Sequence, residues 1–222
     1  MSDVTPPDDL EATIDLSARR EVVDAAYADR DVASADRDAE REATSAPVPA
    51  RVRPELPADS PIAGGYHLRP LAWADITRVA ALEVELFGPS AWTMGMLTEE
   101  LRGRGRWYVA VQPDGEGVPA PLVGYAGLWF DGDSCHLMTI GVDPRVAGHG
   151  LGGAMLDALV ERAREIDAVS MLLEVAVDNE RAIAMYSSRG FTTIGLRKRY
   201  YQPEDVDAYT MQLLLRDGAA GS

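Results

Sequence analysis

A glycine-rich segment, Gly148–Gly153, separates two contrasting hydrophobic patterns in this chain of 222 residues. Before it, Cys135–Val142 is a short apolar run of strand length, which Asp143-Pro144 brings to an end. After it, apolar side chains recur at helical spacing, at Leu151, Met155, Leu156, Leu159 and Val160. The glycines therefore open a helix shortly after a strand, and this order restricts the chain to folds that contain a strand–turn–helix unit.

Such a turn can bind an anion. The first N–H groups of a helix have no partner within the helix and carry partial positive charge, and glycines let a bulky group approach the backbone closely. The turn therefore suits a phosphate or a diphosphate. The alternative is that the glycines only make a tight turn, and the segment alone does not decide between the two.

The spacing Gly148-x-Gly150-x-x-Gly153 also matches the dinucleotide-binding fingerprint, and Glu174 lies about where its ribose-binding acid would fall. However, five residues, Pro144 among them, separate the apolar run from Gly148, whereas the turn of the fingerprint follows its strand almost directly. The motif also begins too late in the chain for a full doubly wound nucleotide domain to follow. We therefore do not interpret it as a dinucleotide site.

An ordered series of further motifs surrounds the glycines. The strand ends in Ile140-Gly141-Val142-Asp143-Pro144, and downstream come Leu172-Leu173-Glu174-Val175, Asn179, Ala182-Ile183-Ala184-Met185-Tyr186 and Gly190-Phe191. The last motifs are Arg197-Lys198-Arg199-Tyr200-Tyr201 and Asp207-Ala208-Tyr209-Thr210-Met211, and upstream stand Leu82-Glu83, Leu86-Phe87 and Trp92. Over about residues 66 to 216, this series resembles the GCN5-related N-acetyltransferase (GNAT) superfamily, in particular its RimI-type ribosomal-protein-alanine acetyltransferases.

The resemblance implies an α/β fold, classed as α+β in some schemes. We expect a three-layer domain with a mixed, mostly antiparallel sheet flanked by helices on both faces. The implied co-substrate is acetyl-CoA, bound by Ile140, Gly141, Val142, Gly148, His149, Gly150, Leu151, Gly152, Gly153 and Asn179. The family's leading Gln or Arg of the loop falls on Ala147, and a usual basic position falls on Gly148. Backbone N–H groups must therefore do most of the phosphate binding, with help from His149.

The implied chemistry is direct attack of an amine on the thioester, with Glu174 as the general base and Tyr186 as the general acid. A strand end, a turn and most of a helix separate these two residues, so only the fold can bring them together. Without the flanking motifs, Glu174 would be interpreted as a charge on a solvated strand face. Tyr186 would be interpreted as a helix-packing residue.

Acid–base chemistry favours an N-terminal amine as the acceptor. A free α-amino group has a pKa of about 7.7–8.0 and a lysine about 10.4, so near pH 7 roughly a tenth of the first and a few ten-thousandths of the second is neutral. A single carboxylate therefore has the lighter task on an α-amine, in line with the N-terminal alanine of a ribosomal protein that the resemblance implies. The alternatives are an acetyltransferase for lysine or a small-molecule amine, and a catalytically silent acyl-CoA-binding module.

The first part of the chain has a different composition. Residues 1–60 contain 15 Asp or Glu against 7 Arg, with Tyr27 as their one aromatic residue, and five prolines lie between Pro47 and Pro61. Such a segment buries little apolar surface and is typical of disorder followed by an extended linker. We expect a disordered acidic extension over residues 1–62, a GNAT domain over 63–217 and a flexible end over 218–222.

The net charge of −15 argues against general nucleic-acid binding, which needs clustered cations. An acidic body attracts a basic polypeptide instead, such as a ribosomal protein. The basic and aromatic run Arg197–Tyr201 is the exception. It is interpreted either as a late strand with alternating faces or as the wall of an acceptor channel. We expect a monomer without a nucleic-acid partner.

No segment is apolar enough for a membrane span, and the N-terminus lacks the pattern of a signal peptide, so we expect a cytoplasmic protein. Cys135 is the only cysteine, which excludes an internal disulfide. Its neighbour His136 would point to the opposite face of a strand, which opposes a Cys–His nucleophile pair. The histidines His67, His136 and His149 show no metal-ligand spacing, so we expect no metal site.

The remaining elements follow from periodicity and turn signals. Helices are predicted over Asp75–Phe87 and Thr93–Arg102. Strands are predicted near Tyr66–Pro70, Trp107–Val111, Leu122–Phe130, Thr192–Tyr201 and Ala208–Leu215, with a hairpin turn around Pro113-Asp114-Gly115.

Overall fold

The computed structural model describes residues 60–88, 91–115, 120–202 and 205–216. These residues form an eight-stranded sheet in the order β1-β2-β3-β4-β5-β6-β8-β7. The strands are β1 (Ser60–Ile62), β2 (Tyr66–Pro70), β3 (Arg106–Pro113), β4 (Gly124–Phe130), β5 (Cys135–Val142), β6 (Ser170–Ala176), β7 (Thr192–Tyr201) and β8 (Val206–Leu214). Neighbouring strands are antiparallel except β5 and β6, which are parallel.

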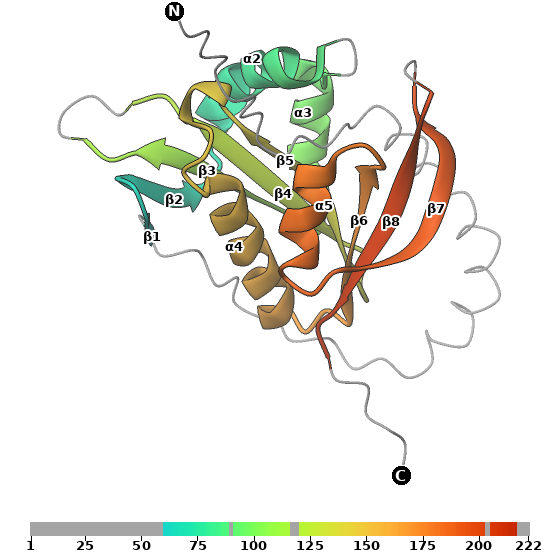
Figure 1. Ribbon diagram of the computed structural model, residues 1–222. Coiled ribbons are helices and arrows are strands. Elements are labelled where there is room, and N and C mark those ends of the chain that lie inside the picture. The colour runs from blue at the N-terminus through green and yellow to red at the C-terminus, as the bar shows by residue number, and fades with distance from the viewer. Residues whose placement is uncertain (1–59, 89–90, 116–119, 203–204, 217–222) are drawn as a thin grey trace, which may run out of the picture.

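Helices cover both faces of the sheet. They are α2 (Ile76–Phe87), α3 (Met94–Arg102), α4 (Leu151–Glu165) and α5 (Glu180–Ser187), with short 3-10 turns η1 (Trp73–Asp75) and η3 (Pro144–Val146). Figure 1 shows α4 and α5 in front of the sheet, and α2 and α3 behind its upper part. The apolar side chains form one large cluster beneath α4 and α5 and a second beneath α2 and α3. The expected three-layer fold with a mixed, mostly antiparallel sheet is confirmed.

The helices form where the hydrophobic pattern predicts them. In α4, Leu151, Met155, Leu156 and Leu159 are all at most 1% exposed, because their spacing places them on the side that faces the sheet. α3 begins after Thr93, whose hydroxyl accepts a hydrogen bond from the Met96 N–H at 3.3 Å. None of the helices in the described ranges combines the length and the apolar character needed to cross a membrane.

Most predicted elements are found within two residues of their expected ends. The predicted helices Asp75–Phe87 and Thr93–Arg102 correspond to α2 and α3, and the apolar run Cys135–Val142 is β5. The last strand begins earlier than expected, at Val206 rather than Ala208. The predicted turn after Pro113 is described only as far as residue 115.

One difference concerns the start of the folded domain. Residues 60–62 were expected to belong to the linker, but Ser60–Ile62 form β1 and pair with β2, with Pro61 opposite His67. A proline is tolerated on an outer strand such as this one because only one edge of the strand needs hydrogen-bond donors. The predictions for residues 1–59 and 217–222 lie outside the described residues.

Candidate active site

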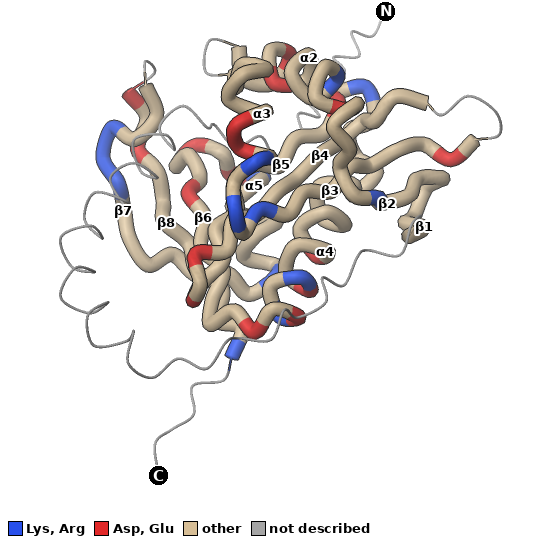
Figure 2. The backbone as a smooth tube through the Cα atoms, turned by 180° about the vertical axis from the view of Figure 1, so that it is seen from behind, with Lys and Arg blue, Asp and Glu red and all other residues tan. Residues whose placement is uncertain are grey.

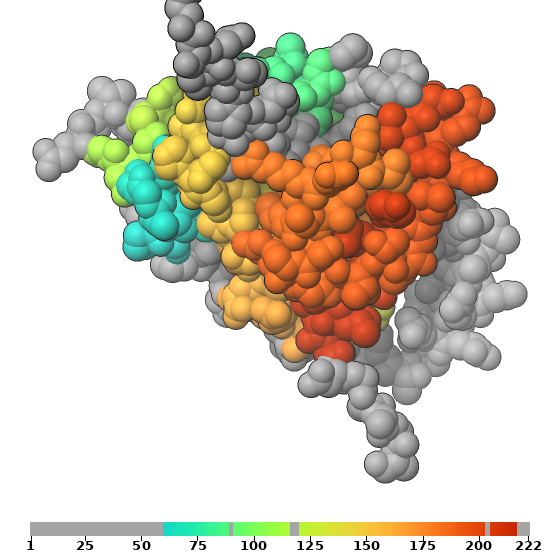
Figure 3. Space-filling view, viewed as in Figure 1, coloured from blue at the N-terminus to red at the C-terminus, as the bar shows by residue number. Residues whose placement is uncertain are grey.

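The glycine-rich loop follows β5 and lines a hollow beside α5. Gly148 and Gly150 have φ angles of 82° and 73°, so glycine is favoured at both positions. α4 then begins at Leu151, as predicted, and the Ala154 N–H donates to the Gly150 carbonyl at 3.0 Å. Figure 3 shows α5 in orange next to the yellow surface of the loop. The hollow has a volume of about 290 Å³ and is lined by Gly148, Gly150, Gly152, Gly153, Arg181, Met185 and Arg189.

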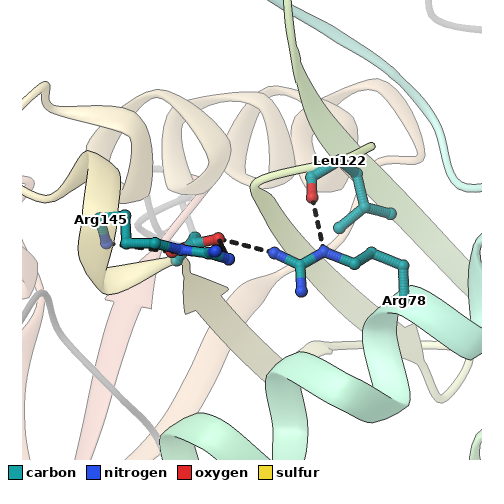
Figure 4. A network of polar contacts seen from close by, with 4 residues as sticks. Arg78, Leu122 and Arg145 are labelled. Carbon is teal, nitrogen blue, oxygen red and sulfur yellow. Dashed lines mark hydrogen bonds and ion pairs between the residues drawn. The ribbon is translucent and has the colours of Figure 1, made fainter. Parts of the chain in front are cut away.

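A buried carboxylate fixes the entry to this loop. Asp143 is 2% exposed and accepts hydrogen bonds from Arg78 Nη2 at 2.6 Å and from Arg145 Nε at 2.8 Å. Arg78 also donates to the Leu122 carbonyl at 3.2 Å, which links α2 to the segment just before β4 (Figure 4). The Arg145 guanidinium beside Asp143 lowers the pKa of that carboxyl. The network therefore holds the end of β5 and the turn η3 in a fixed position relative to α2.

The pairing between β5 and β6 ends early. Ladder pairs join Cys135 to Met171 and His136 to Leu172, and none joins the rest of these two strands in the described chain. On its other side, β5 pairs with β4 as far as Val142 opposite Gly124. In the described chain, the edge of β5 that faces β6 thus has no ladder partner along Ile140–Val142, and backbone groups at such an edge need a hydrogen-bond partner. These are the strand residues predicted to face the cofactor.

Gly141 is required by the packing behind it. A Cβ atom at this position would lie 2.9 Å from both Leu86 Cδ1 and Tyr125 Cε1, closer than real contacts allow. Tyr125 is held there by its hydroxyl, which donates to Glu83 Oε1 at 2.5 Å, and Glu83 also accepts from the Trp92 N–H at 3.0 Å. Burial raises the pKa of Tyr125 well above its usual value. The hydrogen bond from the Trp92 N–H to Glu83 explains why these two residues belong to one motif.

The predicted base, Glu174, lies in the middle of β6, with 17% of its side chain exposed. Arg197 of β7 reaches across β8 and donates from Nη1 to Glu174 Oε1 at 3.2 Å. The Arg197 guanidinium also lies 4.8 Å from the ring centre of Tyr200. Glu174 is therefore a partly exposed carboxylate whose orientation is held by a cation from the neighbouring hairpin.

The predicted acid, Tyr186, lies near the end of α5 and is fully buried. Its ring packs edge-on against Phe191, with ring centres 5.8 Å apart. It belongs to the apolar cluster beneath α4 and α5, together with Leu173 and Val175 of β6. The packing role expected of this tyrosine is thus present in the structure, and its role as the general acid stays a prediction.

The side chains of Glu174 and Tyr186 lie on opposite faces of the sheet. Successive side chains of a strand alternate between its faces, so Glu174 points away from Leu173 and Val175, which pack on the same side as Tyr186. Glu174 and the edge of β5 both lie beyond the point where pairing between β5 and β6 stops. The arrangement leaves one face of the sheet for a ligand bound at the glycine loop and the other for a molecule that meets Glu174.

Comparison with known proteins identifies this arrangement. A sequence model described as the acetyltransferase (GNAT) family matches residues 73–191, more than half of the chain. The chain belongs to the GNAT family of acetyltransferases. The matched range begins at η1 and ends just after α5, so it contains the glycine loop, Glu174 and Tyr186.

Named relatives support the RimI-type resemblance. The N-alpha-acetyltransferase RimI of Mycobacterium tuberculosis is 40% identical over 147 residues, which cover 64% of this chain and 88% of that protein. The putative ribosomal protein bS18-alanine N-acetyltransferase of Bacillus subtilis is 30% identical over 151 residues, which cover 68% of this chain and 96% of that protein. Arabidopsis thaliana NAA60, solved in complex with acetyl-CoA, has the same fold, with a TM-score of 0.61 at 17% identity over 67% of this chain and 99% of that one.

Two residues of the GNAT domain that were predicted to bind the cofactor have side chains that contact the backbone of the protein itself. Asn179 caps α5, since its Oδ1 accepts a hydrogen bond from the Ala182 N–H at 3.1 Å. The His149 ring lies within hydrogen-bonding distance of the Val146 carbonyl, with Nδ1 at 2.9 Å, and it packs edge-on against Tyr66. His149 is not among the residues that line the hollow.

Two arginines beside the GNAT loop were not predicted from the sequence. Arg181 and Arg189 line the hollow with Met185 between them. The three residues are spaced four apart, a spacing that places side chains along one side of a helix, so the sequence contained a signal for them. Two basic side chains, one from α5 and one from the segment that follows it, thus lie beside the glycine loop.

The basic run Arg197–Tyr201 lies on β7, where Figure 2 shows a stretch of Lys and Arg at the edge of the sheet. Tyr200 and Tyr201 are buried, at 8% and 3% exposure, in a small cluster with Ala208, Ala176 and Val206. Ala176 lies two residues after Glu174, so the cluster adjoins the carboxylate on the same face of β6. The strand predicted for this run is therefore confirmed, and the acceptor-channel wall stays a prediction.

The other candidate chemistries have no support in the described residues. Burial raises the pKa of the Cys135 thiol to about 12, so this side chain is a poor nucleophile. Within the same residues, no three side chains of the His, Cys, Asp and Glu types come together as potential metal ligands.

Proposed function

We propose that this GNAT enzyme transfers the acetyl group of acetyl-CoA to the N-terminal α-amine of a ribosomal protein, with alanine as the first residue. The observation that carries the proposal is the early end of the β5–β6 ladder. It leaves the β5 edge and Glu174 at one opening of the sheet, with the glycine loop on one side and the carboxylate on the other. The named RimI-type relatives support the choice of acceptor.

The described residues fit acetyl-CoA. The hollow at the loop combines open helix N–H groups, glycines that leave the backbone accessible, and two arginines, a set that suits phosphate oxygens. Its volume of about 290 Å³ is at the lower limit for a whole small-molecule pocket, which suits the diphosphate part of a larger ligand. We propose that the β5 edge, Ile140–Val142, binds the extended amide-containing arm of the same ligand through backbone hydrogen bonds. When bound, acetyl-CoA supplies a thioester carbonyl that accepts an amine.

Proton transfer is assigned to two side chains of this chain. The incoming amine is mostly an ammonium group near pH 7, and Glu174 accepts its proton, directly or through a water molecule. Arg197 keeps the carboxylate oriented at 3.2 Å until the acceptor arrives. Tyr186 lies on the cofactor side of the sheet, where its hydroxyl donates a proton to the departing sulfur. The buried surroundings of Tyr186 keep bulk water away from that step.

The proposed acceptor also determines where the enzyme acts. An enzyme that modifies a ribosomal protein must meet it where ribosomal proteins are made, so we propose a cytoplasmic location. Every residue in the proposed mechanism comes from one chain, and we propose that a monomer is active.

Mass spectrometry of two matched peptides tests the acceptor. Both are incubated with the protein and acetyl-CoA; one has a free N-terminal alanine and no lysine, and the other has a blocked N-terminus and an internal lysine. We expect acetylation of the alanine peptide and little or none of the lysine peptide, because the α-amine is a few hundred times more often neutral, about 10² to 10³-fold. Acetylation of lysine alone would contradict the proposal. Acetylation of neither would shift attention to a small-molecule amine or to a silent acyl-CoA-binding module.

A further inference from the structure

The glycine loop of this enzyme carries little positive charge of its own. Ala147 and Gly148 stand where the family has polar or basic residues, and the His149 ring is turned toward the Val146 carbonyl. The chain as a whole has a net charge of −15, and CoA is itself a polyanion because of its phosphates. Binding by backbone N–H groups alone would therefore work against a repulsive field. A cation close to the loop is needed to offset it.

Arg189 is not the best candidate, because its guanidinium is already used. It donates from Nε and Nη2 to the two carboxylate oxygens of Asp157, at 2.5 and 3.0 Å, and from Nη1 to the Met185 carbonyl at 3.3 Å. A Cβ atom on Gly153 would lie 2.4 Å from Arg189 Nη2, so this arginine occupies the space that a side chain at 153 would fill. Arg189 therefore forms a fixed wall of the hollow, with much of its charge compensated by Asp157.

Arg181 differs from Arg189 in each of these respects. It lines the same hollow, its side chain is exposed, and in the described part of the chain no carboxylate pairs with it. It also lies in the first turn of α5, where the helix dipole disfavours a cation by about 0.3–1 kcal/mol. A residue that opposes its own helix is more often retained for a function than for stability.

We propose that Arg181 binds a phosphate group of the CoA moiety and replaces the basic side chain that the loop lacks. This inference rests on the proposed use of acetyl-CoA and adds a specific residue to it. An arginine on α5 can pair with a phosphate through two parallel N–H···O bonds, while the N–H groups at the start of α4 approach the ligand from the loop side.

Calorimetric titration of the full chain with CoA tests the proposal. Arg181→Gln keeps the length of the side chain and removes its charge, and we expect CoA binding about tenfold or more weaker. Arg181→Lys retains the charge without the fork geometry and should recover part of the loss. Arg164→Gln is the matched control, because Arg164 is exposed on the last turn of α4, where it forms an ion pair with Glu161. It should bind CoA like the unchanged protein.

A second measurement separates binding from folding. The thermal midpoint of ligand-free Arg181→Gln should equal or slightly exceed that of the unchanged protein, since a cation is removed from a helix N-terminus. The rise of this midpoint on addition of CoA should be smaller in the variant. Equal CoA affinity in Arg181→Gln and the unchanged protein, or an equal loss in Arg164→Gln, would overturn the assignment of Arg181. Failure of the unchanged protein to bind CoA would instead contradict the proposed function itself.

Titration with 3′-dephospho-CoA identifies the phosphate that Arg181 binds. The loss of affinity in Arg181→Gln persists with this ligand if Arg181 binds the diphosphate, and it disappears if Arg181 binds the 3′-phosphate.

Discussion

As the proposed general base, Glu174 should matter most when most of the acceptor amine is still protonated. Glu174→Gln keeps the size of the side chain and an oxygen that can accept from Arg197 at the 3.2 Å contact. We expect the variant to lose about a hundredfold to ten-thousandfold in kcat, while its affinity for CoA stays unchanged. The deficit should shrink as the pH rises past about 8, because the α-amine then loses its proton without help. Rate measurements from neutral to alkaline pH with the alanine peptide test this expectation.

The control is Glu161→Gln, which removes an exposed carboxylate on α4 with 67% of its side chain accessible. Its rates should match those of the unchanged enzyme at every pH. A loss in Glu174→Gln that stays constant with pH would assign the residue to substrate orientation rather than to proton removal. Rates equal to those of the unchanged enzyme would show that Glu174 is not the base.

At the scale of secondary-structure elements, Asp143 decides how β5, η3 and α2 are held together. Asp143→Asn removes the charge that pairs with Arg78 and Arg145 inside a site where the aspartate is 2% exposed. We expect a loss of about 2 kcal/mol in the free energy of unfolding near pH 7, the scale of a hydrogen bond to a charged group. Chemical denaturation of the variant measures it, and Asp205→Asn, at an exposed pair with Arg199, should change stability much less.

The effect has a defined pH dependence. The Arg145 guanidinium lowers the pKa of Asp143 in the folded protein, so the stabilising contribution is complete above the unfolded value of about 3.9 and declines as the pH falls through the lower folded value. The difference between the unchanged protein and Asp143→Asn should therefore be largest near neutral pH and decrease under acidic conditions. A difference that grows below pH of about 4 would contradict the role given to this carboxylate.

Hydrophobic periodicity predicts the elements of this fold well but not how they meet. α4 and β5 follow from local patterns that extend over a whole element. The early end of the β5–β6 ladder does not, because the point where two strands stop pairing is a property of the folded sheet rather than of a local pattern. The pairing of β5 with β4 also contains a register shift: Gly127 lies opposite Thr139 and Leu128 opposite Leu137, so Met138 has no partner. This shift keeps both Leu137 and Ile140 in the cluster beneath α4.

The same distinction applies to the candidate site. The glycine loop and Glu174 stand out in sequence because motifs mark them. Arg197 is 23 residues from Glu174, and their contact across β8 depends on the β7–β8 pairing. Arg181 is visible in sequence only through its spacing from Arg189, and the hollow they share appears only once the loop is folded against α5. Some residues of the candidate site could thus be predicted from the sequence, but the side chains that contact them or share the hollow could not.

At the scale of the whole molecule, we expect charge to affect the encounter with the proposed acceptor. The net charge of −15 attracts a basic polypeptide, and this attraction acts at distances that salt shortens, to about 10 Å at 0.1 M ionic strength. The same charge does not attract a neutral acceptor. Salt should therefore separate two acceptors that differ only in charge, provided that acetyl-CoA is saturating so that its own binding does not contribute.

We expect kcat/KM for an alanine peptide followed by several arginines to fall at least about threefold between about 20 and 200 mM NaCl, since screening removes the long-range attraction. The value for a peptide of equal length in which glutamines replace the arginines should change little over the same range. Because both peptides present the same α-amine to Glu174, the chemical step cancels in the comparison, and the remaining difference reports on encounter and on contacts with the acidic body. Equal salt dependence of the two peptides would mean that the charge of this molecule does not select its acceptor, and that recognition lies entirely in the contacts of the first residues beside Glu174 and the Tyr200–Tyr201 cluster.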